Sequence, residues 1–264
     1  MMTIREIRPE DHPALAALWQ SVFRDPGVCA EEFLRFLPEM GSGAAAFEDS
    51  RVLGAAYMVT ALHLHEGGKS RRCGYLYAVA VEPDARGRGL GAALSRAAAE
   101  LGRARGAELI CTWPAEPGLY PWYERVLGAR CALYRTQHTL DSAPGPSVRP
   151  LDPAAYGPRR EALLAGRPHL FCEPAALSFE AVNLAIYGGG LYAVGEGLAA
   201  AFVNGDVTEV VELLGAPPEA AAAVGAALGT RRVRLWQSAV SGEPYLVFVP
   251  DDLPPETVWN LAFD

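Results

Sequence analysis

A glycine- and arginine-rich stretch between two apolar segments carries the strongest chemical signal in this chain. The stretch VEPDARGRGLGAAL spans Val81 to Leu94, and RGRGLG within it spans Arg86 to Gly91. Glycine lets the backbone approach a ligand closely and adopt dihedral angles that other residues avoid. The first turn of a helix presents N–H groups without partners and the positive end of its dipole, so phosphate oxygens bind there. These residues predict a phosphate-binding turn, and a flexible surface turn is the alternative.

The spacing of the glycines separates this stretch from two common nucleotide-binding motifs. It lacks the third glycine of G-x-G-x-x-G at the required offset, which argues against a dinucleotide fold. A nucleotide-hydrolysing P-loop requires a lysine after its glycines, and this stretch has none. The spacing that fits is R-x-x-G-x-G, which occurs here as Arg86, Gly89 and Gly91. A V-x-P pattern precedes it at Val81 and Pro83.

Alternating strands and helices are predicted to position this stretch. The apolar run GYLYAVAV, residues 74–81, is typical of a strand buried on both faces. An alanine-rich helix is predicted from about Leu90 to Arg105, followed by a strand from Glu108 to Trp113. The expected strand–turn–helix order places the glycines at a helix start. Elsewhere in this half the pattern predicts strands over 3–8, 44–47, 52–64, 130–134 and 136–140, and helices from Pro9 and over 31–37.

Together, the motif, the strand before it and the helix after it resemble the acetyl-coenzyme A motif of the GNAT superfamily of N-acetyltransferases. The likeness extends to the element order of residues 1 to about 140. The resemblance implies an α/β fold with a mixed sheet, the acyl-CoA N-acyltransferase fold of that superfamily. It also implies acetyl-CoA as a co-substrate.

The resemblance assigns the coenzyme A contacts to one continuous region. The strand residues Val79, Ala80 and Val81 would pair through their backbone with the pantetheine arm, where this strand splays from its neighbour. The arginine side chains of the turn either add charge-assisted contacts or stay solvated while the backbone binds. The residues whose backbone N–H groups would hold the pyrophosphate are Arg86, Gly87, Arg88, Gly89, Leu90, Gly91 and Ala92.

A second segment, GLYPWYERVLGA over residues 118–129, is similar to the tyrosine-containing helix of the superfamily. Tyr123 matches the tyrosine that in relatives protonates the leaving coenzyme A thiolate. A donor whose pKa lies near that of a thiol can supply this proton. A packing role for Tyr123 is the alternative, and Tyr120 is the reserve candidate for the acid.

The chain departs from the family pattern at two places. Glu116 stands before the tyrosine where many relatives carry an asparagine. The strand over 74–81 holds no glutamate that could act as general base, and Glu82 precedes a proline and is expected at the surface. Deprotonation of the amine is therefore left to ordered water or to a carboxylate from elsewhere, and no base is named.

The second half of the chain repeats the layout of the first. Residues 141–153 are rich in proline, glycine and serine and are predicted to link a GNAT domain over 1–140 to a second domain over 154–264. The segment GAPPEA, residues 215–220, stands where the first half has RGRGLG, and its two prolines remove two N–H donors. We predict tandem copies, of which the second is a degenerate GNAT-like domain without the coenzyme A motif. Two similar α/β domains arising by chance are the alternative.

Composition excludes several classes of protein. Of 264 residues, 50% are hydrophobic and 20% are charged, which is the profile of a globular chain of one or two domains. The net charge of −8 argues against nucleic-acid binding and is compatible with a cationic substrate. Glu209 and Glu212 either face such a substrate or are exposed or paired charges. No apolar run reaches the roughly 18 residues of a membrane span. A charged N-terminus without a secretory signal predicts a cytoplasmic location.

Neither the cysteines nor the histidines show the spacing of a metal site. His63 and His65 alternate on a predicted strand and share one face, but no nearby cysteine or spaced carboxylate completes a ligand set. We therefore expect no metal. The five cysteines are expected as buried thiols; they are Cys29, Cys73, Cys111, Cys131 and Cys172.

These observations predict an acetyl-CoA-dependent N-acetyltransferase acting on a primary amine of a small molecule or peptide. The alternative is a non-catalytic acyl-CoA-binding sensor or scaffold of the same fold. The missing strand glutamate favours the binding protein, and Tyr123 favours the enzyme. No nucleic-acid or membrane partner is expected, and a homodimer is left open.

Overall fold

The computed structural model describes residues 2–261, and the chain divides into two compact units. Unit 1 contains the chain up to His63 together with Ser70–Ala132 and Leu246–Asp252. Unit 2 contains Leu64–Lys69, Leu133–Tyr245 and the chain from Leu253 onward. Each unit is therefore discontinuous in sequence, in contrast to the two continuous ranges that the sequence pattern predicted.

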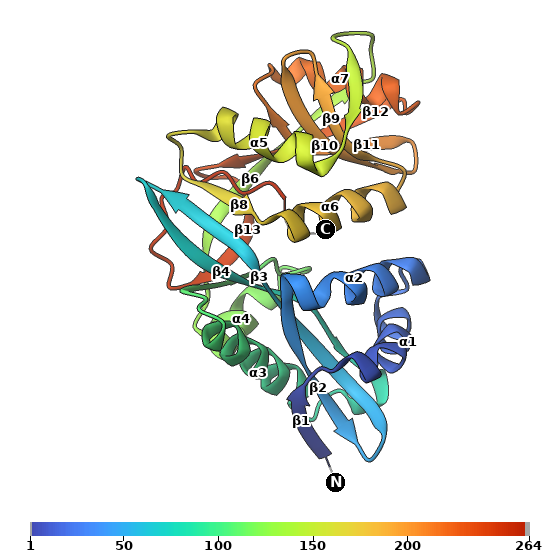
Figure 1. Cartoon of the computed structure of the whole chain (residues 1–264), viewed down its shortest axis with the longest axis vertical. Coiled ribbons are helices and arrows are strands. Elements are labelled where there is room, and N and C mark those ends of the chain that lie inside the picture. Colours follow the sequence, from blue (N-terminus) through green and yellow to red (C-terminus); the bar gives the residue numbers. More distant parts are fainter. Residues whose placement is uncertain (1, 262–264) are drawn as a thin grey trace. The chain divides into compact units, whose positions relative to one another are not determined.

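Unit 1 is a mixed sheet with helices on both faces (Figure 1). Its strands follow the order β1-β2-β3-β4-β5-β13, in which β4 and β5 run parallel and β13 pairs antiparallel with β5. The elements that contribute to this unit are β1 (Met2–Glu6), α1 (His12–Phe23), α2 (Gly27–Met40), β2 (Gly41–Glu48), β3 (Arg51–Glu66), β4 (Lys69–Val81), α3 (Leu90–Ala104), β5 (Leu109–Thr112), α4 (Leu119–Leu127) and β13 (Glu243–Val249).

Alternation along β3 gives each face of this sheet its own core. Met58 and Ala56 face α3, where they pack with Leu94 and Ala98. Tyr57, between them in sequence, faces the other way and lies 5.0 Å, between ring centroids, from Phe33 of α2. Successive side chains of a strand point to opposite faces, so β3 is buried on both sides and reads as a continuous apolar run. This confirms the predicted α/β class with a mixed sheet.

Unit 2 repeats this strand order with its own elements (Figure 1). Its sheet runs β7-β9-β10-β11-β12-β6, with β11 and β12 parallel and β6 antiparallel to β12. The sixth strand of each unit lies outside the stretch of chain that holds the other strands of that unit. In unit 2 it is β6, which precedes them, and in unit 1 it is β13, which follows them. The elements are β6 (Arg130–Asp141), β7 (Val148–Leu151), α5 (Pro153–Leu164), β8 (His169–Cys172), α6 (Pro174–Ile186), β9 (Gly190–Val194), β10 (Gly197–Asn204), β11 (Val207–Leu214), α7 (Ala221–Ala227) and β12 (Arg232–Ala239).

Several predicted elements differ from those in the structure. Helix α2 continues past Pro38 to Met40, because a proline in the last turn removes only one hydrogen bond before the helix ends at Gly41. One strand, β6, covers the range in which two strands were predicted, and it pairs with β12 from Tyr134 to Asp141. The proline-rich segment 141–153 is not a free linker, since it contains β7, which pairs with β9.

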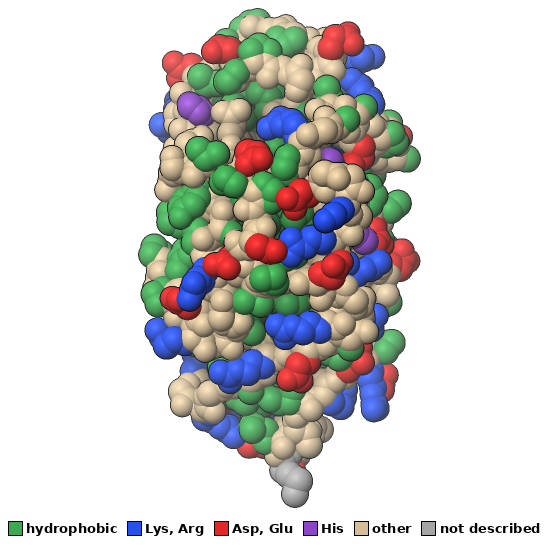
Figure 2. Space-filling model, turned by 90° about the vertical axis from the view of Figure 1, so that its left-hand side faces the viewer, with side chains coloured by type: hydrophobic (Ala, Val, Ile, Leu, Met, Phe, Trp, Pro, Cys, Tyr) green, Lys and Arg blue, Asp and Glu red, His purple; other side chains and the backbone are tan. Residues whose placement is uncertain are grey.

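Charged side chains of both signs are interspersed over the face shown in Figure 2. Ion pairs on the surface of unit 1 join Arg51 to Asp84 at 2.8 Å and Arg105 to Glu6 at 3.0 Å. The negative net charge is therefore not gathered into one acidic patch on this face. No helix in residues 2–261 is both long and apolar enough to cross a membrane.

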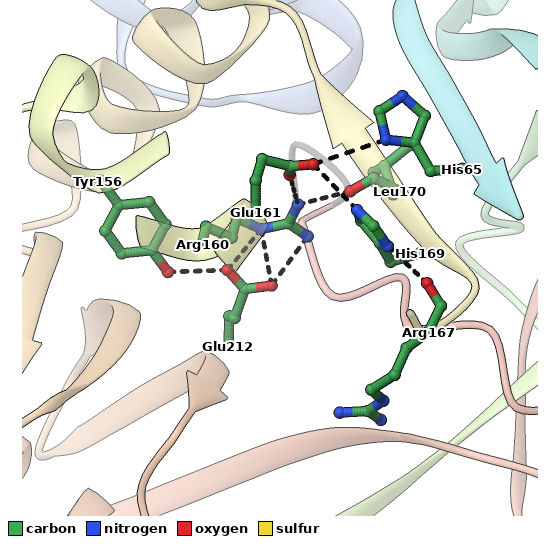
Figure 3. A network of polar contacts seen from close by, with 8 residues as sticks. All are labelled: His65, Tyr156, Arg160, Glu161, Arg167, His169, Leu170 and Glu212. Carbon is green, nitrogen blue, oxygen red and sulfur yellow. Dashed lines mark hydrogen bonds and ion pairs between the residues drawn. The ribbon is translucent and has the colours of Figure 1, made fainter. Parts of the chain in front are cut away.

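A buried ion pair lies between the sheet of unit 2 and α5 (Figure 3). Arg160 of α5 and Glu212 of β11 are 2% and 0% exposed, and the Arg160 Nε lies 2.9 Å from Glu212 Oε1. Tyr156 donates its hydroxyl to the same carboxylate at 2.8 Å. Burial of both charges is tolerated because each has its partner in place. Glu212 is thus committed to a structural pair.

We expect Arg160→Leu to destabilise unit 2 by about 3–5 kcal/mol, because it leaves the Glu212 carboxylate buried without a cation. In a Tyr156→Phe background, the double change Arg160→Leu with Glu212→Leu removes both charges and should recover most of that loss. Urea unfolding followed by circular dichroism measures both effects. An Arg160→Leu protein as stable as the parent would contradict this account.

Candidate active site

The parallel ladder between β4 and β5 is short and stops in the middle of unit 1. It joins Cys73 to Leu109, Gly74 to Ile110 and Tyr75 to Cys111, and it ends there although β4 continues to Val81. Past this point, Ala78 has a φ of +46°, which is uncommon for a residue with a side chain. β5 itself ends at Thr112, one residue beyond the last pair, so the edge of β4 past this point has no neighbour from β5.

Past the end of β4, a turn and a helix follow in the order that the sequence indicated, and we call residues 86–92 the cradle. A 3-10 turn, Pro83–Ala85, leads into the glycines, and α3 begins at Leu90. Gly87 and Gly89 have φ values of +75° and +76°, where a side chain would be strained. Space around them is open, since a Cβ at either position would meet no atom within 4 Å.

The start of α3 has the features of an anion site. No side chain in the described part of the chain caps the helix, and no acidic residue lies in its first turn. The first intrahelical bond runs from the Ala93 N–H to the Gly89 carbonyl at 3.1 Å, so the N–H groups of the three residues between them have no partner within the helix. With the helix dipole, these donors favour a negatively charged group.

The arginine side chains of the cradle make contacts within the protein. The Arg86 Nε donates to the Val81 carbonyl at 3.1 Å, which holds the turn against the end of β4. The Arg88 guanidinium donates to Glu48 at 3.0 Å. A bidentate pair between Arg51 and Asp84 ties the start of β3 to the same turn. These contacts shape the cradle and leave the backbone N–H groups as its anion donors.

Tyr123 reaches the place where the ladder between β4 and β5 ends. The Thr112 hydroxyl, at the end of β5, donates to the Leu76 carbonyl of β4 at 2.8 Å. The same hydroxyl adjoins the Tyr123 phenol, whose pKa it lowers against the larger effect of burial. Thr112 therefore lies between the phenol and the edge of β4.

Burial keeps this phenol protonated. Tyr123 is 6% exposed, and burial raises its pKa above the ordinary value of 10.0. The ring packs edge-on against Trp122, with centroids 4.8 Å apart, and Trp122 also lies 3.6 Å from the position of a Cβ on Gly91. Thus α4 carries Tyr123 to the strands and Trp122 to the cradle.

Other residues singled out from the sequence lie at the edges of this region. Tyr120 is half-buried on α4, one turn before Tyr123. Glu116 is exposed, and its carbonyl accepts from the Leu119 N–H at the start of α4. Glu82 accepts a hydrogen bond from the Ser21 hydroxyl at 3.1 Å in an exposed position, which agrees with its expected place at the surface. Thr112 was not predicted, and the only sequence signal was its place near the end of a predicted strand.

The matching region of unit 2 keeps the strand irregularity and loses the cradle. Ala200 of β10 pairs with Glu212 of β11 and Ala201 pairs with Val210, so Val211 is left out of the register. In the sequence of β11, Val211 has the position that Ala78 has in β4. The ladder between β11 and β12 also ends early, at Val210 and Leu235. Past β11 stands a proline turn leading into α7, which is only 7 residues long.

Comparison with known families identifies the first half of the chain. Residues 3–125 match the family model described as an acetyltransferase (GNAT) domain. This segment is a GNAT domain. The match covers the whole region from β1 to most of α4 and includes β4, the cradle and Tyr123. Comparison with curated proteins gives no match.

Solved structures extend the likeness of fold to both units. A GCN5-related N-acetyltransferase from Kribbella flavida is 17% identical with a TM-score of 0.70, over 94% of this chain and 70% of that chain. The corresponding protein from Anabaena variabilis is 13% identical with a TM-score of 0.67, over 94% and 72%. Eis1 from Mycobacterium abscessus is 16% identical with a TM-score of 0.62, over 92% and 66%. At these identities the likeness shows that the chain shares their fold.

We expect Thr112→Val to destabilise the GNAT domain by about 1–3 kcal/mol, because it removes the buried hydrogen bond that the Thr112 hydroxyl donates to the Leu76 carbonyl. Thr112→Ser retains the hydroxyl and should cost less. Thermal unfolding at fixed pH compares the two variants with the parent. Equal melting temperatures for the valine and serine variants would show that the hydrogen bonds add no stability.

Proposed function

We propose that this protein is an acetyl-CoA-dependent N-acetyltransferase that transfers an acetyl group to a primary amine of a small molecule or peptide. One observation carries the proposal: the uncapped start of α3 follows the end of β4, whose edge beyond Tyr75 has no neighbour from β5, and the buried Tyr123 lies at the start of that edge beside Thr112. Donors for an anion, a free strand edge and a protonated phenol thus lie within one domain. This combination suits a ligand with a pyrophosphate, an extended amide-bearing arm and a reactive thioester.

The residues present fit acetyl-CoA. Open space at Gly87 and Gly89 admits a phosphate group close to the backbone, and the N–H groups from Arg86 to Ala92 supply its donors. The edge of β4 at Val79, Ala80 and Val81 supplies N–H and C=O groups for the amides of the pantetheine arm. When bound, acetyl-CoA supplies the thioester whose acetyl group moves to the amine.

Tyr123 is the residue proposed to act in the chemical step. Its hydroxyl gives its proton to the sulfur as the thioester C–S bond breaks, and its raised pKa keeps that proton available at neutral pH. The backbone of β4 orients and polarises the thioester carbonyl. The amine attacks as its neutral form, and its excess proton passes to solvent.

Unit 2 is proposed to be a GNAT-like copy that no longer binds coenzyme A. Its strand order, its parallel pair and its irregular strand repeat those of unit 1. Pro217 and Pro218 stand at the turn that would have to supply N–H donors, and proline has none. The unit retains the architecture and has a different use for its central strand, where Glu212 is paired with Arg160.

The second candidate function is acyl-CoA binding without turnover. Within residues 2–261, β4 carries no glutamate between Gly74 and Val81, and the Tyr123 hydroxyl is engaged with Thr112. Both features suit a sensor or scaffold. Ligand binding and turnover distinguish the two functions, because a binding protein has the first without the second.

We expect Gly91→Glu to abolish acetyl-CoA binding, whereas Gly91→Gln should retain it more weakly than the parent. Gly91 has an ordinary helical conformation and room for a Cβ, so both side chains fit at the start of α3. The variants differ only in charge, and a carboxylate repels the pyrophosphate. Calorimetric titration measures both. Unchanged binding by the glutamate variant would place the pyrophosphate elsewhere.

We expect Tyr123→Phe to lower kcat about 100-fold or more while leaving the Kd for acetyl-CoA unchanged, because it removes the acid and keeps the ring. Release of the coenzyme A thiol with a panel of amines measures kcat. Since burial raises the pKa of Tyr123 above 10.0, loss of this acid should not lower kcat of the parent below pH 10.

Tyr120→Phe is the matched control, because it removes a hydroxyl from the same helix one turn before Tyr123. If Tyr120→Phe lowered kcat and Tyr123→Phe did not, the acid would be Tyr120. Tight acetyl-CoA binding with no turnover of any amine would favour the binding function.

A further inference from the structure

Two histidines and a glutamate converge in unit 2, beside the buried Arg160–Glu212 pair (Figure 3). His65 lies near the end of β3, in the turn Leu64–Lys69 that belongs to this unit. Glu161 lies on α5, and His169 begins β8, which pairs with β3. One ligand atom from each side chain lies within 4.8 Å of the other two.

A single carboxylate oxygen stands at the centre of this cluster. Glu161 Oε2 lies 3.0 Å from the His169 Nε2 and 3.6 Å from the His65 Nδ1. Nitrogen and oxygen ligands about 2.0–2.2 Å from a tetrahedral metal stand about 3.3–3.5 Å from one another. The two measured distances bracket that value. The two histidine nitrogens lie within 4.8 Å of one another, so their side chains would move closer together on binding a small cation.

The hydrogen-bond partners of the two His169 ring nitrogens point to a positive charge between His169 and Glu161. Its Nδ1 lies 2.7 Å from the Arg167 carbonyl, which can only accept, so the hydrogen is on Nδ1. In the neutral ring, Nε2 then directs a lone pair at the Glu161 carboxylate, which also offers only lone pairs. Two such acceptors at 3.0 Å need a positive charge between them, either a second ring proton or a metal ion.

The histidines are held as metal ligands usually are. A ligand histidine commonly donates its other ring N–H to a carbonyl, which fixes the tautomer, and His169 does so to Arg167. The His65 ring stacks on Phe171 with centroids 4.8 Å apart and an interplanar angle of 11°. Both rings are thus oriented before any ion binds, which lowers the entropy cost of binding.

Arg160 is a nearby cation that would repel a metal ion, but its charge is compensated. The Arg160 guanidinium lies 3.3 Å from Glu161, but it contacts Oε1 and leaves Oε2 to the histidines. Its charge is already compensated by the buried Glu212 carboxylate, which it contacts through Nε and one terminal nitrogen. The Glu161 carboxylate therefore keeps its charge for the cluster, and its pKa is lowered below the ordinary value despite partial burial.

We propose that His65, Glu161 and His169 bind a divalent transition-metal ion of the zinc class. Two imidazoles and one carboxylate are a ligand set that Zn²⁺ accepts, with the remaining position filled by water. His65 and Glu161 are 34% and 29% exposed, so both an ion and that water can reach the site from solvent. The ion fastens the turn at Leu64–Lys69 to α5 and β8. The sequence concealed this site because Glu161 and His169 lie far from His65 along the chain.

The test is a titration of the full chain with Co²⁺, whose visible absorption reports coordination by nitrogen and oxygen ligands, followed by displacement with Zn²⁺. We expect one equivalent of Co²⁺ to bind with micromolar affinity and Zn²⁺ to displace it. His65→Ala, Glu161→Gln and His169→Gln should each weaken Co²⁺ binding at least about tenfold, since loss of an outer-shell partner alone costs about 10–100-fold.

His63→Ala is the matched control. His63 lies on the same strand and its Nδ1 is near the Ser70 hydroxyl, so its removal should leave Co²⁺ binding unchanged. Circular dichroism identifies any variant that fails to fold, and His65→Ala, at a partly exposed position, provides a test that does not depend on the buried His169. Zn²⁺ should also raise the melting temperature of the parent in proportion to occupancy, and less so in His65→Ala.

Two results would overturn the proposal. Absence of Co²⁺ absorption and of any Zn²⁺-dependent rise in melting temperature would show that His169 and Glu161 share a proton instead. Binding of equal strength in the parent and in a folded His65→Ala protein would place the ion at other residues. Neither result depends on acetyl-CoA, so the metal-site proposal is tested independently of the transferase activity.

Discussion

The short ladder between β4 and β5, beyond which β4 is separate from β5, is the constraint on which the candidate active site depends. Parallel strands normally satisfy each other's backbone groups along their length, and because β5 ends at Thr112 part of the β4 edge has no neighbour from β5. The positive φ at Ala78 is a local strain within this part of β4. Such strain persists only where surrounding packing holds it. The alanine-rich face of α3 and the aromatic side chains from α1 and α2 hold β4 from both sides.

Other features of unit 1 follow from that separation. The hydrogen bond from Thr112 to Leu76 crosses the gap at its narrow end and gives Tyr123 a partner there. At the other end of β4, the turn into α3 presents helix N–H groups, which Arg86 and Asp84 hold in place through contacts with Val81 and Arg51. The buried Tyr123 and the uncapped start of α3 thereby lie toward the two ends of one strand segment.

Unit 2 has the same frame with a different turn and a different central strand. Its central strand keeps an irregularity at the matching position, but prolines replace the donors and a buried arginine–glutamate pair occupies one side of the sheet. Charged pairs of this kind are costly to break and add little over apolar packing. Here the pair commits α5 to β11, and it also leaves one oxygen of the adjacent Glu161 for the histidines of β3 and β8.

Local sequence determined the parts of this protein that depend on residues close together in the chain. The glycines, the helix after them and the buried strand before them all follow from spacing, periodicity and backbone freedom, and so the cradle and the α/β class were predictable. The position of Tyr123 on a short helix ending at Gly128 was predictable for the same reason.

Tertiary structure alone decided what depends on residues far apart. The Thr112 bridge, the pairing of Glu212 with Arg160, the place of β13 beside β5 and the meeting of His65 with Glu161 and His169 arise from strand pairing across the chain. Propensity and periodicity report only on neighbouring residues. They cannot show which carboxylate will stand opposite a given histidine, because that is set by the register of strands and by the packing of a helix on a sheet.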